Sequence, residues 1–295
     1  MRKIAGIALI LAAVCAATVP AASAAPADKP LLSYKLTGLW PGISGGEYND
    51  CILGENDYLR AASTSMSGAY EELGRGLGFQ IEVILPLGRS LGVGVGGGYY
   101  RIRSEGTVTY AGLADDVAFS AESTLVSRLS VLPFFLNLHY TRDLGPRLTL
   151  DAFAGPLFQI VQFNADNPST STLLQTEQTV TFTATKTSLG LQAGLGASYR
   201  LIKGVSLVLD AIFRTGKVAD LKGNWTRVGT DANGAIAGSS DAYYLWAYDM
   251  TAGGTYQRAW FFGEGGPDAA GAANARKAAV GISGLTFQAG VRLSL

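Results

Sequence analysis

The final segment of the chain, residues 285–295, alternates strictly between apolar side chains and polar or small ones. One face carries Leu285, Phe287, Ala289, Val291, Leu293 and Leu295, and the other carries Thr286, Gln288, Gly290, Arg292 and Ser294. A period of two indicates a β-strand with one apolar and one polar face. Because terminal residues usually fray, so regular a strand at the end predicts that it is held in a sheet.

The same alternation recurs in seven earlier segments of about ten residues, the length that a tilted membrane strand requires. They cover residues 32–40, 77–85, 91–99, 132–140, 148–156, 188–201 and 205–214. The connections alternate between long (41–75, 103–125, 164–185 and 217–279) and short (86–89, 143–146 and 203–204). In the third long segment, Val180 and Phe182 suggest that strands continue beyond a membrane.

Bacterial barrels place long loops outside and short turns in the periplasm, and in lipid no sheet edge may stay unpaired. The sequence therefore predicts an all-β fold, an eight-stranded antiparallel up-and-down transmembrane β-barrel with long extracellular loops and short periplasmic turns. If hairpins in the loops extend the barrel, ten strands are the alternative to eight.

The predicted outward faces are almost purely apolar, whereas the inward faces are small, polar or charged. Gly38-Leu39-Trp40 also fits the G-x-W of lipocalins, but a soluble barrel would not turn its charges inward. The narrow interior predicts a buried ion-pair network that fills it, and a narrow polar channel is the alternative. The expected network consists of Glu82, Asp151, Arg200, Asp210, Arg214 and Arg292.

The N-terminus predicts a Sec-type signal peptide over residues 1–24, which leaves residues 25–295 as the barrel domain. Arg2 and Lys3 precede an apolar run, and Ala22-Ser23-Ala24 gives a cleavage site. No later run is long enough for a transmembrane helix. The remaining chain is nearly neutral, without a basic patch of the nucleic-acid-binding kind. Cys51 becomes its only cysteine, either an inert loop thiol or a site of intermolecular pairing.

A catalytic centre is not expected. The one histidine, His139, is predicted to face the interior and to be hydrogen-bonded there. The loop carboxylates Asp115, Asp116, Asp241 and Asp249 have no histidine nearby in the sequence, so solvated charges are the simpler interpretation. No metal-ligand spacing is present, and we expect neither enzyme activity nor a cofactor.

The longest connection, 217–279, is rich in aromatic residues, which are unusual in a loop unless they pack together or meet a partner. Two interpretations remain. The aromatic residues either pack against one another as a cap formed by the loop, or they form a surface for an extracellular ligand. The candidate binding residues are Tyr244, Trp246, Tyr248 and Trp260.

The chain resembles the small eight-stranded outer-membrane barrels, of the outer membrane protein A barrel and opacity-like type. The strand pattern carries this resemblance, together with a C-terminal motif similar to the assembly signal of such proteins. That motif comprises Gln288, Gly290, Leu293 and Leu295, the last standing where Phe is usual.

The resemblance implies a Gram-negative outer-membrane location, lipid and lipopolysaccharide around the barrel, and contact with the barrel-assembly machinery. We expect a non-enzymatic barrel with a structural envelope role and surface loops that bind a partner. The alternative is a narrow pore for ions or small solutes.

Overall fold

The computed structural model describes residues 32–114, 116–252, 255–267 and 272–295, so the expected signal peptide and Asp115 lie outside the described residues. Eight strands form a closed antiparallel ring in the order β1, β3, β4, β5, β6, β7, β8 and β15, and β15 pairs with β1. The ring strands are β1 Ser33–Pro41, β3 Gly76–Pro86, β4 Leu91–Ala114, β5 Val117–Asp143, β6 Leu148–Ser171, β7 Thr176–Ile202, β8 Val205–Arg214 and β15 Gly284–Ser294. Each of the eight expected segments overlaps one of these strands.

The outward face of the ring exposes large apolar side chains on every strand, because one residue in two points away from the interior. Leu189 and Leu77 are 79% and 66% exposed. We name this surface the apolar belt. It includes Leu36, Leu77, Phe79, Ile81, Val95, Phe134, Leu136, Leu138, Phe158, Leu189, Leu191, Leu195, Leu209 and Phe287.

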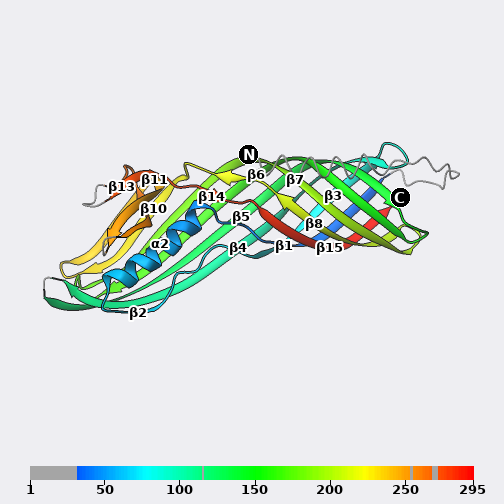
Figure 1. The fold of residues 1–295 in the computed structure, drawn as a ribbon. Helices are drawn as coiled ribbons and strands as arrows, with labels where there is room; N and C mark the ends of the chain where they lie inside the picture. The colour runs from blue at the N-terminus through cyan, green and yellow to red at the C-terminus, as the bar shows by residue number, and fades with distance from the viewer. Residues whose placement is uncertain (1–31, 115, 253–254, 268–271) are drawn as a thin grey trace.

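Four ring strands continue well past the ring at one end, where they join further elements in a part that we name the extension (Figure 1). It comprises the distal parts of β4, β5, β6 and β7 and the elements that pack on them. These elements are α2 Glu47–Ala62, β2 Ser65–Gly68, β9 Lys217–Val218, β10 Lys222–Asp231, β11 Gly234–Ala252, β12 Thr255–Gly263, β13 Ala273–Lys277 and β14 Val280–Gly281.

The long connections expected between the ring strands are largely strand themselves. The segments 103–125 and 164–185 are mostly strand, since β4 pairs with β5, and β6 with β7, almost to the hairpin tips. The segment 217–279 contributes strands β9 to β13, and the segment 41–75 contains a helix and a short strand. Backbone pairing beyond the belt satisfies amide groups that would otherwise need water.

Helix α2 packs into a hydrophobic core that continues from the extension into the adjoining end of the ring. Tyr48, Cys51, Ile52 and Leu59 recur at helical spacing and are buried. The Tyr48 ring meets Phe163 of β6 edge-on, at 5.1 Å between centroids. Further members of this core are Tyr70, Leu73, Val108, Leu125, Ala165, Phe182, Ala184, Val218, Leu221, Leu245, Ala247, Phe262, Ala278 and Val280.

Two asparagines, seven residues apart on one face of α2, fix the returning chain against the helix. Asn49 Nδ2 donates to the Leu73 carbonyl (2.7 Å) and its Oδ1 accepts from the Leu73 amide (3.0 Å). Asn56 makes the same pair of bonds with Tyr70, at 2.9 and 2.8 Å. Each asparagine side chain thus supplies the hydrogen bonds that a neighbouring strand would otherwise give to this buried stretch of backbone.

Among the described residues, no helix has the length and apolarity to cross a membrane.

Candidate functional site

The interior of the ring holds a chain of titratable side chains centred on His139 of β5. His139 Nε2 lies 2.9 Å from Glu82 Oε1, and its Nδ1 lies 3.1 Å from Asp151 Oδ1. Arg292 Nη2 donates to the other Asp151 oxygen at 2.8 Å. The imidazole also stacks on Phe153, with 5.2 Å between ring centroids. Both ring nitrogens therefore face carboxylates, which come from strands β3 and β6.

Lys35 of β1 joins a third carboxylate to this chain. Its Nζ lies 2.8 Å from Asp210 Oδ2 of β8 and 3.9 Å from Glu82 Oε2. The ammonium also lies 4.9 Å from the centre of the Phe153 ring. Gln288 donates to the same Asp210 oxygen, and Thr37 donates to Gln288 Oε1 at 3.0 Å. Since all of these side chains are buried, the ammonium charge is balanced inside the ring.

Arg214 is connected to Glu82 through two side-chain amides. Its Nε donates to Gln192 Oε1 (3.2 Å), Gln192 donates to Asn137 Oδ1 (2.9 Å), and Asn137 donates to Glu82 Oε1 (2.7 Å). Arg214 Nη2 also donates to Gln80. The interior thus carries three cations, Lys35, Arg214 and Arg292, and three carboxylates, in one connected network.

The expected network needs one correction, because Arg200 does not belong to it. Arg200 lies at the end of β7, beside a register shift between Arg200 and Ile202, and its side chain is exposed. Lys35 belongs to the network although it is not among the residues expected there. The signal was present, since Lys35 shares the inward face with Ser33 and Thr37, opposite Tyr34 and Leu36.

An apolar layer separates this network from the extension. It consists of inward-facing side chains next along the strands, all at most 1% exposed: Leu39, Tyr100, Ile102, Leu129, Val131 and Val161. Tyr100 lies opposite Val131, and Ile102 lies opposite Leu129, across the β4–β5 pair. The Tyr100 hydroxyl donates to Gln159 at 3.2 Å, so its one polar atom is paired.

The four candidate aromatic residues of the segment 217–279 do not form a single exposed patch. Trp260 of β12 packs on the core and meets Phe262 edge-on at 5.0 Å. Tyr244 and Trp246 lie on β11 with their rings 6.4 Å apart, and Trp246 Nε1 donates to the Gly263 carbonyl (2.9 Å). Tyr248 is half-buried, and burial raises its pKa to about 12.

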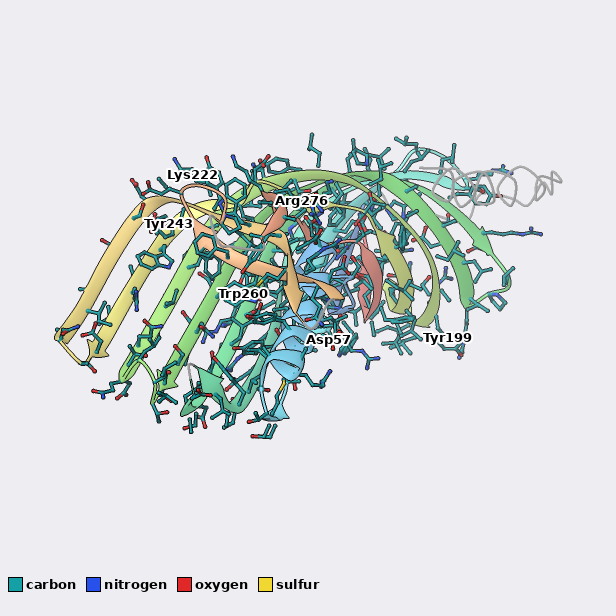
Figure 2. All side chains as sticks on the ribbon, turned by 60° about the vertical axis from the view of Figure 1, so that its left-hand side comes forward. Asp57, Tyr199, Lys222, Tyr243, Trp260 and Arg276 are labelled. Carbon is teal, nitrogen blue, oxygen red and sulfur yellow. The ribbon has the colours of Figure 1, made fainter. Side chains whose placement is uncertain are left out.

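Lys277 Nζ lies 3.7 Å from the centre of the Tyr244 ring, a distance typical of a cation–π contact. Figure 2 shows Tyr243, Trp260 and Arg276 on the extension and Tyr199 at the ring. These contacts favour the self-packed interpretation of the segment, with Tyr244 and Trp246 still partly exposed.

The residues of the expected assembly signal have defined places in β15. Gln288 faces the interior and binds Asp210, whereas Leu293 and Leu295 are exposed at the end of the ring. Gly290 lies against β1 so closely that an added Cβ would come within 1.9 Å of the Leu36 carbonyl oxygen. Recognition by assembly machinery stays a prediction.

The loop carboxylates are dispersed rather than paired. Asp241 and Asp116 are exposed, and Asp249 accepts a hydrogen bond from Asn274 (2.9 Å). Across the described parts of the chain, no group of three or more histidine, cysteine, aspartate or glutamate side chains is arranged to hold a metal ion. Near the hairpin tips, a shallow hollow is lined by polar side chains, among them Thr109, Glu122, Thr172, Gln175 and Glu177.

Comparison with known proteins found no matching family model and no matching curated protein. A major outer membrane protein from Thermus thermophilus has TM-score 0.35 and 16% identity, over 90% of this chain and 99% of that chain. The outer membrane protease OmpT from Escherichia coli has TM-score 0.31 and 10% identity, over 93% of this chain and 99% of that chain. We therefore infer location and function from the side chains of this chain.

Proposed function

We propose that this chain is an integral outer-membrane β-barrel of a Gram-negative bacterium, with a plugged interior, a structural role in the envelope and an extracellular extension that presents a binding surface. In this proposal the ring is an eight-stranded up-and-down barrel surrounded by lipid, and the short turns face the periplasm. No catalytic role is assigned to it.

The observation that carries the proposal is the inverted polarity of the ring. Its apolar belt faces outward on all sides, while Lys35, Glu82, Asp210 and Arg214 are buried within. In water, such a belt would be a large exposed apolar surface, of a size that soluble monomers avoid. In lipid the same belt is solvated, and the closed ring leaves no unpaired strand edge.

The interior supports a plug rather than an open path. An eight-stranded barrel is just wide enough to be filled by side chains. The connected network and the apolar layer above it lie in series, so a permeating ion would have to displace both. We therefore expect the folded barrel to be silent in a planar bilayer.

The test combines insertion with conductance. We expect the mature chain to refold into phosphatidylcholine vesicles, to float with them in a density gradient, and to migrate differently on a gel before and after boiling. The same preparation should give no steady single-channel current. A chain that stays monomeric in buffer without detergent and does not float would overturn the membrane assignment.

A narrow pore is the second candidate, and one observation favours it. Within the described residues, Asp210 Oδ1, Arg214 Nη1 and Arg292 Nε are buried without a protein hydrogen-bond partner. Ordered water commonly binds buried polar atoms that lack a protein partner, so the network is compatible with a hydrated path. A stable conductance that changes on Asp210→Asn would establish the pore and refute the plug.

The proposed binding surface of the extension rests on Tyr244 and Trp246, which keep part of their rings exposed on β11. Aromatic faces of this kind suit the apolar faces of sugars or a protein partner. A glycan array probed with the folded chain tests the first class. Binding that is lost in Tyr244→Ala would support it, and equal binding by that variant would refute it.

A further inference from the structure

The Glu55 carboxylate, on the core-facing side of helix α2, has no basic partner in the described part of the chain. Glu55 continues the helical stripe of buried residues formed by Tyr48, Cys51, Ile52 and Leu59. Its side chain keeps partial contact with solvent, and burial without a neighbouring cation raises the pKa of its carboxyl group to about 7. An enclosed charge is costly unless it meets a partner, so Glu55 marks a place where a cation would be stabilised.

Gly54, the residue before Glu55, brings the helix against β12. An added Cβ there would collide with the backbone carbonyl group of Arg258. The residue of β12 that follows this contact, Ala259, pairs with Tyr248 across the β11–β12 ladder. Tyr248 is partly exposed, and the Glu55 carboxylate helps to raise the pKa of its phenol. One tyrosine thus approaches Glu55 from the side of β12.

Three further tyrosines lie around Glu55. On the side away from β12, Asn56 is hydrogen-bonded to both backbone groups of Tyr70. The Glu55 carboxylate raises the pKa of the phenols of Tyr70 and Tyr110, the latter on β4. Tyr58 lies one helical turn after Glu55, packs against the same core and likewise acts on the Tyr110 phenol. Phenols from four parts of the chain therefore surround one carboxylate, and we name this group the Glu55 cage: Glu55, Tyr58, Tyr70, Tyr110 and Tyr248.

The composition of the Glu55 cage indicates which kind of cation fits it. Calcium and magnesium ions require several oxygen ligands, whereas the cage offers one carboxylate, and no metal-holding group is found in the described residues. A primary ammonium group has three N–H donors that need acceptors. A quaternary ammonium group has no donor to satisfy, and aromatic faces attract it when it lies within about 6 Å of the ring centre.

We propose that the Glu55 cage binds a small quaternary ammonium solute, with the Glu55 carboxylate as its counter-ion and tyrosine rings around its methyl groups. Tyr58, Tyr110 and Tyr248 are partly exposed, as Glu55 is, which gives a small solute access. A free solute is favoured over the headgroup of a choline lipid, because the phosphate of such a headgroup would lie beside a carboxylate without a cation to receive it. The cage belongs to the extension, so the inference does not depend on the proposed membrane location.

The experiment measures choline binding to residues 25–295, refolded in octyl glucoside micelles, by ligand-observed NMR titration at pH 8. The reference ligand is the uncharged alcohol in which a carbon atom replaces the nitrogen of choline. We expect choline to bind at least about tenfold more tightly than this alcohol, since only choline offers a charge to the carboxylate and the rings. Lowering the pH to 5.5 protonates Glu55 and should weaken choline binding at least about fivefold.

Matched variants separate the two parts of the cage. Glu55→Gln keeps the size of the side chain and should remove both the preference for choline and its dependence on pH. Asp57→Asn is the control, because Asp57 is an exposed carboxylate on the same helix, paired with Arg60. It should bind choline as wild type does. Tyr248→Phe keeps an aromatic ring and should retain binding, whereas Tyr248→Leu should weaken it.

The other outcomes overturn the inference. Equal binding of choline and the alcohol, or an unchanged preference in Glu55→Gln, would show that no cation is held at Glu55. Equal loss in Tyr248→Phe and Tyr248→Leu would refute the role of the ring. Competition by sodium ions at the choline concentration would show an unselective cation site, and tighter binding of a short-chain phosphatidylcholine would show a headgroup site. Gel heat-modifiability and tryptophan fluorescence verify that each variant is folded. Binding in micelles is independent of insertion into vesicles, so this inference and the membrane assignment fail separately.

Discussion

Lys35 of β1 and Asp210 of β8 form an ion pair inside the ring, with 2.8 Å between Nζ and Oδ2 and both side chains almost fully enclosed. These strands are not neighbours, because β15 lies between them. The pair therefore spans β15 on the interior side of the ring. Because a buried charge without its partner is costly, the two side chains stabilise the ring only together.

We expect Lys35→Met to lower the free energy of unfolding by about 3 kcal/mol, because it leaves Asp210 and Glu82 short of a cation. Arg200→Met is the matched control, since Arg200 is exposed and outside the network. It should change stability by no more than about 0.5 kcal/mol. Urea unfolding in detergent micelles measures both. Equal midpoints for the two variants would show that the interior does not depend on this ion pair.

The contrast between Lys35 and Arg200 shows what alternation can and cannot predict. A closed ring with an apolar outer face and a polar interior imposes a period of two on each ring strand, so the ring and its inward faces can be derived from the sequence. Alternation does not reveal where a strand leaves the ring. Arg200 has inward parity but lies at the strand end, beside a register shift, where its side chain reaches water.

The extension was predictable only in part, for a physical reason. Beyond the apolar belt, the outward face of a strand need not be apolar, and distal β6 and β7 are rich in Ser and Thr. Val180 and Phe182 were the remaining signal, and they do lie in β7. Helix α2 was missed because Asn49, Gly54 and Asn56 are weak helix formers, and the tertiary contacts of those residues stabilise it instead.

Asn56→Ala should loosen the extension while leaving the ring intact. The variant removes both hydrogen bonds to Tyr70 and leaves two buried backbone groups unpaired, which costs about 1–3 kcal/mol each. We expect faster proteolysis within the segment 63–75 and unchanged gel heat-modifiability. Asp57→Ala, which removes only a surface pair with Arg60, should behave as wild type. Equal protection in both variants would contradict a fastening role for Asn56.

Gly54→Ala should destabilise the extension, although replacing glycine by alanine usually stabilises a helix. In an exposed helix, alanine is favoured over glycine by about 1 kcal/mol. Here an added Cβ would come within 1.9 Å of the Arg258 carbonyl oxygen of β12, so the helix must shift. We expect a lower thermal midpoint for the extension, followed by the fluorescence of Trp225 and Trp260. A raised midpoint would show that α2 does not lie against β12 at this distance.

Cys51 should be unreactive in the folded chain. Its side chain is fully buried in α2, and burial raises the pKa of the thiol to about 12, with the nearby Glu47 carboxylate adding to the shift. Because the thiolate is the reactive species, a thiol reagent should label residues 25–295, prepared without the expected signal peptide, only after denaturation. Labelling at native pH before unfolding, or a disulfide-linked dimer under oxidation, would support intermolecular pairing instead.

Glu55 on α2 should make the extension less stable as the pH rises through neutrality. Burial raises the pKa of its carboxyl group from 4.5 to about 7. Between these values the folded chain keeps a proton that the unfolded chain has lost. The free energy of unfolding therefore falls as the pH rises from about 4.5 to 7, and it levels off above that.

A pKa shift of this size corresponds to a change of about 3 kcal/mol in the free energy of unfolding. Because Glu55 keeps partial contact with solvent, we expect a change of about 1–2 kcal/mol. Glu55→Gln should abolish this dependence of stability on pH. Subtracting the stability-against-pH curve of the variant from that of wild type removes the contribution of ionisable groups in the ring. The neighbouring Tyr248, whose pKa is raised to about 12, does not titrate in this window. Thermal midpoints followed by tryptophan fluorescence between pH 4.5 and 8 measure the difference. Parallel profiles for the two chains would show that Glu55 ionises freely in water.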